Sequence, residues 1–252
     1  VVFPLPIFPA TAICILVFVY KNKTRFSTFT RHKNNKNMSE VKVFYVNELR
    51  ECCYLLWDET KECVIVDPGM QNANENARLE KFITEKGLTP QMVLLTHAHF
   101  DHIMGLAFIE KRWGVPVMMN SADKRLLADA EKYFKMWEAE AELPSAETID
   151  VEDGQSISFG NTKILAIATP GHTRGGMSYY VPKDNLLFTG DTLFAGSIGR
   201  TDLPGGDYDQ LMESLLDKLI PTVDRDATVL PGHGYPTTIV QELQNNPFLR
   251  YE

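Results

Sequence analysis

Three histidines and an aspartate lie within six positions of the chain, at residues 97–102, whose sequence is His-Ala-His-Phe-Asp-His. Imidazole nitrogens and carboxylate oxygens are ligands that Zn²⁺ and similar ions prefer in proteins. Side chains at positions i and i+2 of an extended segment point the same way. His97 and His99 are therefore expected to bind one ion, while Asp101 and His102 turn toward a neighbouring one. The spacing predicts a centre for two metal ions.

One local pattern precedes three further candidate ligands. An apolar segment that is typical of a strand is followed by a glycine, and the next residue is His172, Asp191 or His233. Because glycine lets the backbone turn tightly, the sequence predicts that four strand ends converge on one rim of the fold. A Gly-Asp-Thr sequence in isolation is more typical of an ordinary turn, but the repeated pattern favours a ligand role for Asp191.

Together these segments offer seven donors, five imidazoles and two carboxylates. That number exceeds the ligand set of one tetrahedral ion and suits two ions of higher coordination that share a carboxylate and a water. A hydroxide bridging two such ions would be available at neutral pH, because a metal lowers the pKa of bound water to about 7 from roughly 15.7. Asp101 is placed to orient that hydroxide or to take its proton. Ester, thioester, amide and phosphodiester hydrolysis are all consistent with this chemistry.

Other residues are candidates for supporting roles. Asp67, in Asp-Pro-Gly, is either a turn former or a hydrogen-bond partner of a histidine ligand. Residues 196–202 form either a surface loop with an Asp–Arg pair or a wall of the substrate site that offers Arg200 to an anionic group. Tyr179 either packs in the core or contacts the substrate. The aromatic side chains of residues 133–137 either pack or border a substrate cleft.

The predicted strands and helices position these candidates. In the first half, strands are expected at residues 41–46, 52–57, 63–66, 92–95 and 115–118, and helices at residues 74–86, 103–113 and 121–140. In the second half, strands are expected at residues 156–159, 162–168, 177–181, 185–189 and 228–230, and helices at residues 207–219 and 237–245. The order does not alternate strictly between strand and helix. It favours an α/β (α+β) fold of two halves packed sheet to sheet.

The composition is ordinary for a soluble globular enzyme, with 252 residues of which 44% are hydrophobic and 10% aromatic. The first 37 residues hold six of the 25 basic residues and none of the 33 acidic ones. Residues 38–252, which we expect to form a single domain, therefore carry 19 basic against 33 acidic residues, a formal net charge of −14. This acidic body argues against nucleic acid as a partner, and a small-molecule substrate is expected.

Residues 1–37 form an apolar and then basic lead segment, which we expect to be disordered or not translated. Only residues 10–20 are an apolar run without proline, and eleven residues are too few to span a bilayer comfortably. A membrane partner is therefore not expected. Translation is expected to begin at Met38, which intact-mass measurement of the native protein would test. Three cysteines without Cys-x-x-Cys spacing predict buried thiols and a cytoplasmic location. They are Cys52, Cys53 and Cys63.

The stretch at residues 97–102 resembles the His-x-His-x-Asp-His motif of the metallo-β-lactamase superfamily. Within it, the chain is similar over residues 41–249 to glyoxalase II, the hydroxyacylglutathione hydrolases, and especially to their short bacterial members. Further matching stretches are Asp-Pro-Gly at 67–69, Pro-Gly-His-Thr at 170–173, Gly-Asp-Thr-Leu-Phe at 190–194, Gly-Arg-Thr-Asp at 199–202, Pro-Gly-His-Gly at 231–234 and Asn-Pro-Phe-Leu at 246–249.

The resemblance implies a four-layer αββα metallo-β-lactamase sandwich and a divided ligand set. The implied ligands are His97, His99 and His172 for one ion, Asp101, His102 and His233 for the second, and Asp191 as the bridge. Metallo-β-lactamases proper usually lack the bridging aspartate, so Asp191 indicates the hydrolase branch. The resemblance thus implies a dinuclear hydrolase acting on a small-molecule thioester. Two divalent ions are expected as cofactors, with Zn²⁺ as the expected metal and iron or manganese as alternatives.

The sequence departs from glyoxalase II in two respects. Ala98 stands where well-studied members have a further histidine, which is not a ligand. Those members also have a C-terminal helical domain that supplies basic contacts to glutathione, and Arg200 is expected to replace part of it.

Two other functions are alternatives to thioester hydrolysis. Residues 199–202 are also similar to the persulfide dioxygenases, which use a single iron to activate oxygen. The iron ligands would then be His97, His172 and Asp191. The third hypothesis is a metal-stabilised module without catalytic activity.

Overall fold

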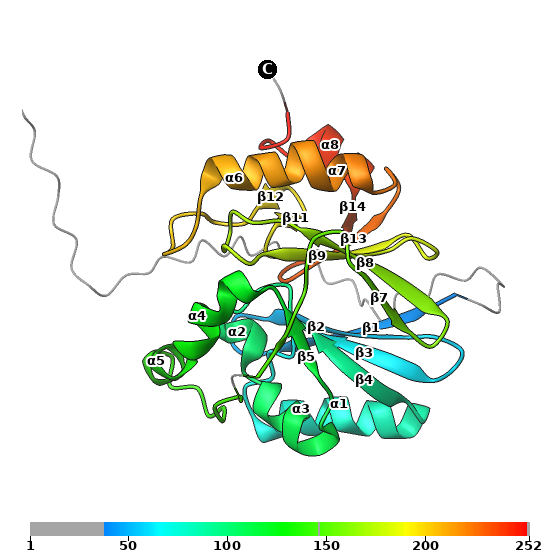
Figure 1. Cartoon of the computed structure of the whole chain (residues 1–252), viewed down its shortest axis with the longest axis vertical. Helices are drawn as coiled ribbons and strands as arrows, with labels where there is room; N and C mark the ends of the chain where they lie inside the picture. Colours follow the sequence, from blue (N-terminus) through cyan, green and yellow to red (C-terminus); the bar gives the residue numbers. More distant parts are fainter. Residues whose placement is uncertain (1–37, 146, 251–252) are drawn as a thin grey trace, which may run out of the picture.

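Two six-stranded β-sheets face each other, and helices cover the outer face of each sheet (Figure 1). The computed structural model describes residues 38–145 and 147–250. The four layers confirm the αββα architecture. The expectation for residues 1–37 lies outside the described residues.

The N-terminal half of the chain builds the first sheet. Its strands, in spatial order, are β1 (Glu40–Val46), β2 (Glu51–Trp57), β3 (Glu62–Val66), β4 (Thr89–Leu94), β5 (Val117–Met119) and β6 (Ile149–Asp150). The first three strands pair antiparallel, and the pairs from β3 to β6 are parallel. Its outer face is covered by α1 (Ala73–Lys86), which ends at Gly87 in the left-handed region, and by α3 (Leu106–Trp113).

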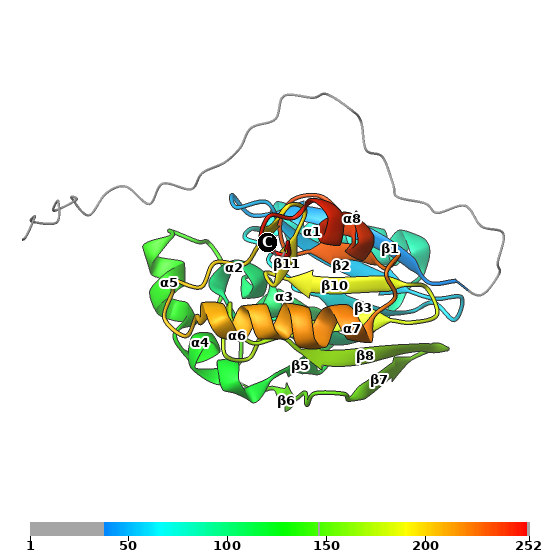
Figure 2. The ribbon, with the colours of Figure 1, turned by 90° about the horizontal axis from the view of Figure 1, so that it is seen from above.

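The C-terminal half builds the second sheet. Its strands, in spatial order, are β14 (Thr237–Thr238), β13 (Thr228–Pro231), β10 (Leu186–Gly190), β9 (Met177–Val181), β8 (Thr162–Ala168) and β7 (Ser156–Phe159). The outer helical segments are α6 (Tyr208–Glu213), the π-helical η2 (Ser214–Leu219), α7 (Ile220–Thr222) and α8 (Ile239–Asn245). Figure 2 looks down on this helical layer. A small ribbon of β11 (Leu193–Phe194) and β12 (Ser197–Ile198) lies beside it.

Three hydrophobic clusters hold the layers together, and β2 shows how one strand serves two of them. Every residue of β2 is buried. Because successive side chains of a strand point to opposite faces, Leu55 packs with the helices below the first sheet, whereas Tyr54 and Leu56 pack between the sheets. The third cluster joins the second sheet to its helices through residues such as Leu211 and Leu215. A strand covered on both faces is predominantly apolar, as β2 is from Cys52 to Trp57.

Two predicted helices are interrupted, and these predictions were wrong in detail. The helix expected at residues 103–113 is divided into α2 (Phe100–Ile103) and α3, with Gly105 between them. The Gly105 backbone lies against Pro68, whose carbonyl oxygen accepts a hydrogen bond from Gly105 N at 2.7 Å. A side chain at this position would come 2.7 Å from that oxygen, so glycine permits the close approach.

The helix expected at residues 121–140 consists of three short pieces. They are the 3₁₀ turn η1 (Ser121–Asp123), α4 (Lys124–Ala128) and α5 (Ala130–Met136). Asp129 separates the last two with φ −84° and ψ 4°. The first and last pieces make separate tertiary contacts: Asp123 accepts hydrogen bonds from two loops of the candidate site, and Tyr133 stacks on Phe100.

The cysteines of the described residues are Cys52, Cys53 and Cys63. All three are buried free thiols, as predicted. Within residues 38–145 and 147–250, no helix combines the length and apolar character needed to cross a membrane.

Candidate metal centre

The structure brings all seven predicted donors together at one edge of the two sheets. The donors lie in the four segments that follow β4, β8, β10 and β13, because these strands end at the same rim. The predicted convergence of four strand ends is therefore confirmed. Two groups of three donors contain only predicted ligands, and Asp191 lies beside both; they are His97, His99 and His172, and Asp101, His102 and His233. A third, overlapping group joins Asp67 to His97 and His102, and the ligand atoms within each group lie within 4.8 Å of one another.

The first group consists of three imidazoles. His99 Nδ1 lies 2.9 Å from His172 Nε2. The ring centre of His97 lies 4.8 Å from that of His99 and 4.9 Å from that of His172. His97 and His172 are buried, and His99 is partly exposed. Three ring nitrogens therefore face a common point.

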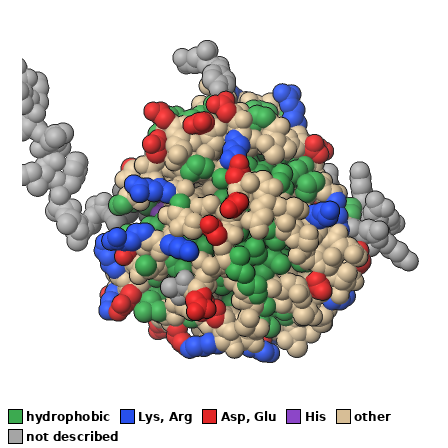
Figure 3. All heavy atoms as spheres, in the orientation of Figure 1, with side chains coloured by type: hydrophobic (Ala, Val, Ile, Leu, Met, Phe, Trp, Pro, Cys, Tyr) green, Lys and Arg blue, Asp and Glu red, His purple; other side chains and the backbone are tan. Residues whose placement is uncertain are grey.

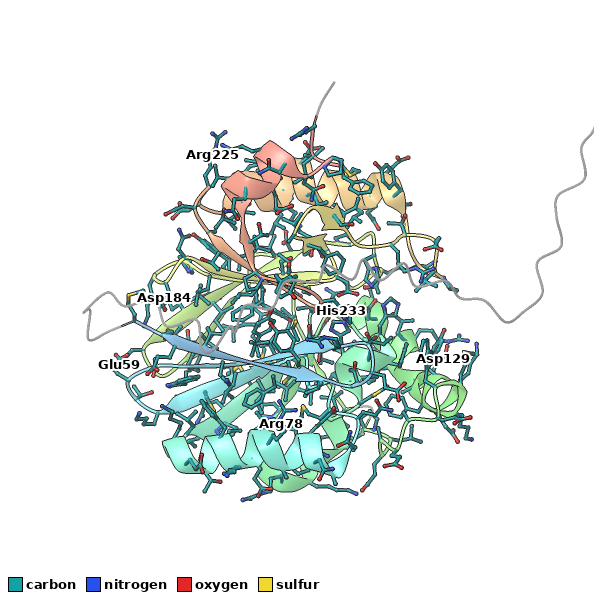
Figure 4. All side chains as sticks on the ribbon, turned by 180° about the vertical axis from the view of Figure 1, so that it is seen from behind. Glu59, Arg78, Asp129, Asp184, Arg225 and His233 are labelled. Atoms are coloured by element: carbon teal, nitrogen blue, oxygen red, sulfur yellow. The ribbon has the colours of Figure 1, made fainter. Side chains whose placement is uncertain are left out.

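The second group combines a carboxylate with two imidazoles. Asp101 Oδ2 lies 3.2 Å from His233 Nε2 and 3.9 Å from His102 Nε2. His102 is fully buried, whereas the side chain of His233 is 26% exposed. In Figure 4, His233 lies between the sheets at the end of the molecule that carries Asp129, while Glu59 lies at the opposite end.

Asp191 lies between the two groups. Its Oδ1 is 3.5 Å from His102 Nε2, and its Oδ2 is 3.6 Å from His172 Nε2 and 3.8 Å from His233 Nε2. Glycine is required beside it, because a Cβ at Gly232 would come 2.3 Å from Asp191 Oδ1. One carboxylate thus reaches histidines of both groups.

Four of the imidazoles are oriented by a hydrogen-bond partner at Nδ1. That contact leaves Nε2 as the atom facing the centre. The Nδ1 partners are Thr96 Oγ1 for His97 at 3.1 Å, Asp67 Oδ2 for His102 at 3.1 Å, the Arg200 carbonyl for His172 at 2.8 Å and the Leu49 carbonyl for His233 at 3.2 Å. The rings are therefore preorganised for a ligand at Nε2.

Three polar atoms at the centre are buried and have no hydrogen-bond partner among the described residues. They are His97 Nε2, His102 Nε2 and Asp191 Oδ1. Buried polar atoms in folded proteins are nearly always satisfied, and a divalent cation satisfies exactly these atom types as ligands. The donor set therefore fits divalent metal ions. The division into individual ligands remains a prediction.

Burial shapes the acid–base behaviour of the first group. Burial, together with the neighbouring His102 and His99, holds the pKa of His97 well below its usual range. Burial, with His172 next, lowers the pKa of His99 to about 4. Both imidazoles are thus neutral, as a metal ligand must be.

Carboxylates shape the second group in the opposite direction. Although burial opposes it, Asp101 and Asp191 raise the pKa of His102 well above its usual range. Against burial, the charge of Asp191 and a hydrogen bond that His233 donates to Asp101 raise the pKa of His233. Despite burial, His233 and His102 hold the pKa of Asp191 well below its usual range. This group therefore binds protons more readily than the first.

Asp67 serves both of the roles considered for it. It turns the chain with φ 49°, and its carboxylate accepts hydrogen bonds from Thr96 N at 2.7 Å and Thr96 Oγ1 at 2.6 Å while contacting His102 Nδ1. Behind it lies Glu51, fully buried, with Oε1 3.8 Å from His102 Nδ1. Burial, reinforced by Cys53, raises the pKa of Glu51 well above its usual range. Nothing in the sequence pointed to Glu51.

Asp123 is a second residue that the sequence did not reveal. Its buried carboxylate accepts hydrogen bonds from Ala98 N at 3.2 Å, Thr173 Oγ1 at 2.8 Å and Gly175 N at 2.7 Å. It therefore ties the loop of the first two histidines to the loop of His172. The surrounding Asn-Ser-Ala-Asp sequence signals a helix start, but its partners 25 and 50 residues away carry no local signal.

The β1–β2 turn, residues 47–50, is also part of the centre. Asn47 Nδ2 donates to the carbonyl oxygens of Gly69 at 3.0 Å and Asp101 at 2.9 Å. The Leu49 carbonyl holds His233, as described above. The turn thus fixes the backbone of one predicted ligand and the ring of another.

The two predicted substrate contacts have different outcomes. Arg200 and Asp202 form a two-pronged ion pair at 2.8 and 2.7 Å, so the Asp–Arg pair is present and engages the guanidinium. Tyr179 was wrong as a substrate contact, because its side chain is fully buried between the sheets. Its hydroxyl donates to the Leu95 carbonyl at 2.9 Å, and it therefore supports the strand that leads to residues 97–102.

Tyr179→Phe is expected to lower the free energy of unfolding by about 1–2 kcal/mol, because the buried Leu95 carbonyl loses its donor. Substrate affinity is expected to stay within about two-fold, since burial excludes contact with a ligand. Denaturant unfolding and steady-state kinetics measure the two effects. An unchanged free energy of unfolding together with a clearly raised KM would instead show that Tyr179 contacts the substrate.

The aromatic residues of α5 divide between core and site. Phe134 is buried in the core. Phe100, inside the histidine cluster, stacks on Trp137 at 5.1 Å and lies 6.1 Å from Tyr133. These three partly buried rings stack together, and Phe100 adjoins His99 in the chain.

Comparison with known proteins agrees with this centre. A family model described as "Metallo-beta-lactamase superfamily" matches residues 48–233. Probable metallo-hydrolase YqgX of Bacillus subtilis is 39% identical over 198 residues, which cover 78% of this chain and 90% of that protein. Hydroxyacylglutathione hydrolase GloC of Haemophilus influenzae is 35% identical over 213 residues, which cover 83% of this chain and 97% of that protein.

Two solved structures extend the comparison. BLEG-1, described as a B3 metallo-beta-lactamase, superposes with a TM-score of 0.76 and 34% identity, covering 83% of this chain and 99% of its own. TTHA1623, solved in a di-iron-bound form, gives a TM-score of 0.74 and 33% identity, with 82% and 100% covered.

Proposed function

We propose that this protein is a dinuclear thioester hydrolase of the hydroxyacylglutathione hydrolase type. The chain belongs to the metallo-beta-lactamase superfamily. Family membership confirms the resemblance seen at residues 97–102. The superfamily consists mostly of metal-dependent hydrolases, and its fold binds divalent metal ions. The likeness to GloC over most of both chains supports a thioester as the substrate.

The position of Asp191 carries the two-ion proposal. Its two oxygens lie 3.5 Å from His102 and 3.6 Å from His172, which belong to different groups. A single ion bound by His97, His172 and Asp191 would leave Asp101, His102 and His233 unused, whereas a carboxylate shared between the two sets of three donors suits a pair of ions.

The residues of this chain then have distinct roles. Bound divalent ions would lower the pKa of water and polarise the acyl carbonyl. Asp101 Oδ2, held beside His233, is placed to orient the attacking water and to receive its proton. Asp67 keeps His102 in one orientation.

Substrate enters where the centre meets solvent. His99 and His233 are the partly exposed histidines, while His97, His102 and His172 are buried. Figure 3 shows only a small patch of histidine at the surface, with Lys and Arg side chains gathered around it at the left edge of the face. On a chain with an acidic body, basic side chains around the opening favour an anionic substrate.

Zinc is the proposed metal, since imidazole and carboxylate ligands suit it. Iron and manganese are alternatives for the same ligands, and TTHA1623 was solved with two irons. Protein of measured metal content is to be assayed with S-lactoylglutathione and other thioesters. About two divalent ions per chain with metal-dependent hydrolysis is the expected result.

The same experiment separates the competing functions. One iron per chain with oxygen uptake on glutathione persulfide would replace the proposal by a dioxygenase. Bound metal without turnover of any substrate would indicate a metal-stabilised module.

A β-lactam is the second candidate substrate, because BLEG-1 is named a metallo-beta-lactamase and is 34% identical. Hydrolysis of a chromogenic cephalosporin is expected to be slower than thioester hydrolysis by the same metal-loaded protein. The reverse ranking would make the lactam the preferred substrate class.

Acidification is expected to release the ion held by Asp101, His102 and His233 first. A histidine with a raised pKa keeps its proton to higher pH and must lose it before binding a cation, so protons compete best at His102 and His233. His97 and His99, with lowered pKa values, stay neutral into mild acid. Dialysis at about pH 5.5 should therefore leave about one ion per chain, against about two at pH 7.5. Loss of both ions together, measured by metal analysis, would contradict this order.

A further inference from the structure

The turn between β1 and β2 carries a basic side chain beside the metal centre. Leu49 orients His233, Asn47 binds the Asp101 carbonyl, and Glu51 forms a β-bridge with His233. The one residue of this segment between Leu49 and Glu51 is Arg50. Its backbone position relative to the centre is therefore fixed.

The backbone of Arg50 is strained. Its φ is 57°, in the left-handed region that side chains other than Asn, Asp and Gly rarely adopt. Asn47 imposes this conformation, because its Oδ1 accepts hydrogen bonds from Leu49 N at 3.0 Å and Glu51 N at 3.4 Å, on either side of Arg50. Such conformations persist where the surroundings dictate them, and they are frequent at ligand-binding positions.

Two tyrosines accompany Arg50. The guanidinium carbon lies 5.5 Å from the ring centre of Tyr45. Tyr45 pairs across the strands with Cys52, which packs between the sheets, so this side of the turn faces the second sheet. Burial raises the pKa of Tyr45, Cys52 and Tyr235 add to the rise, and Arg50 opposes it. Tyr235 directly follows Gly234 in the chain, and the Gly234 carbonyl oxygen accepts a hydrogen bond from Cys52 Sγ at 3.8 Å. Tyr235 therefore lies beside the cross-strand pair of Tyr45 and Cys52.

The charge of Arg50 is available to a ligand. Arg200 is engaged by Asp202, whereas Arg50 has no ion-pair partner within residues 38–145 and 147–250. Tyr45 and Tyr235 are 37% and 68% exposed. Arg50 itself is exposed, and its neighbours in the chain, Leu49 and Glu51, both contact His233. Arg50 therefore lies near the centre and faces solvent.

The other side of the turn repels anions. Glu48 lines a separate hollow together with three more glutamates. They are Glu75, Glu138 and Glu140. An anionic ligand that reaches the turn is thus directed to the side of Arg50.

We infer that Arg50, Tyr45 and Tyr235 bind an anionic group, a carboxylate or a phosphate, on the thiol carrier of the substrate. The guanidinium supplies charge and two parallel donors, and the phenols supply O–H donors. The inference rests on the proposed thioester function and assigns the carrier to the His233 side of the centre.

Binding of the carrier is measured without turnover. Isothermal calorimetry of the metal-loaded protein uses S-methylglutathione, which offers carboxylates, and coenzyme A, which offers phosphates. For the carrier that the wild type binds, Arg50→Gln is expected to lower the affinity about ten-fold. Arg50→Lys is expected to bind this carrier more tightly than Arg50→Gln and less tightly than the wild type. Arg78→Gln is the matched control, because Arg78 is exposed on the outer helix α1 (Figure 4).

Kinetics with one acyl group on two carriers separates binding from damage to the centre. S-lactoylglutathione is anionic, whereas S-lactoyl-N-acetylcysteamine is neutral. Arg50→Gln is expected to raise KM for the anionic thioester about ten-fold and to leave the neutral one within about two-fold. If coenzyme A is the carrier that binds, lactoyl-coenzyme A replaces S-lactoylglutathione.

Three results would overturn the inference. An equal loss on both thioesters would assign Arg50 a structural role through His233. A loss of carrier affinity with Arg174→Gln but not with Arg50→Gln would place the anion on the His172 side of the centre. Absence of wild-type binding to either carrier would also overturn it, while hydrolysis of the neutral thioester would leave the proposed function intact. If no thioester is hydrolysed, the proposed function fails, and calorimetry still decides whether Arg50 binds an anion.

Discussion

Asp191→Asn is expected to lower the metal content from about two ions per chain to about one and kcat/KM for thioester hydrolysis by about 1,000-fold. The carboxylate reaches His102 of one group through Oδ1 and His172 of the other through Oδ2. An amide keeps the shape but removes the negative charge that two neighbouring cations require. Loss of one cation removes several kcal/mol of transition-state stabilisation, and about 1.4 kcal/mol corresponds to ten-fold in rate.

Metal analysis and thioester kinetics of the same preparation measure this effect. Glu59→Gln removes an equal charge from the turn between β2 and β3, at the opposite end of the molecule from His233 (Figure 4), and is expected to retain both metal and activity. If the Asp191→Asn protein keeps about two ions per chain and most of its activity, Asp191 is not a carboxylate shared by the two ions. Far-ultraviolet circular dichroism of both variants establishes that neither has unfolded.

The candidate site could be predicted from the sequence because each donor carries a local signal. His97 to His102 are adjacent, and Asp191 follows a strand and a glycine. Gly190 has φ 48°, and a Cβ there would lie 2.1 Å from Thr96 Oγ1. The glycine that marks the pattern is thus the residue that lets two donor segments meet.

The residues that hold the donors in place could not be predicted in this way. Asp123 binds Thr173 across 50 residues, and the Leu49 carbonyl binds His233 across 184. Every residue has a backbone carbonyl, so the sequence does not show which one binds a histidine. An aspartate at the start of a helix is explained equally well as a capping residue. Such contacts are determined by the packing of the two sheets, which no local pattern encodes.

The fold shows the same division between local and tertiary control. The pattern of apolar residues located β8 and β9 at their observed bounds, because each is a short, mostly apolar run bounded by turn residues. It also predicted one helix at residues 121–140, since the apolar spacing continues past Asp129. On the two sides of the break, Asp123 and Tyr133 make separate tertiary contacts, which periodicity does not encode. Two-residue strands such as β14 are too short for any periodicity.

Asp101→Asn is expected to lower kcat by about 100- to 10,000-fold, the range for loss of a general base. Asp101 Oδ2 lies 3.2 Å from His233 Nε2 in a buried position, and His102 and His233 keep its pKa low despite burial. The carboxylate is therefore ionised at neutral pH and able to accept a proton or orient water. Asparagine retains an oxygen for the metal and loses the basicity.

Titration of the Asp101→Asn protein with metal separates its two possible contributions. If Asp101 acts on the water, kcat stays low after the second ion has been restored, as measured by metal content and single-turnover kinetics. Recovery to within about two-fold of the wild type at saturating metal would show that Asp101 only holds the ion. Asp101→Ala extends the comparison, because alanine removes both functions and should lose the second ion even at metal concentrations that restore it to asparagine. The difference between the two variants then measures how much of the Asp101 effect passes through metal binding and how much through the proton.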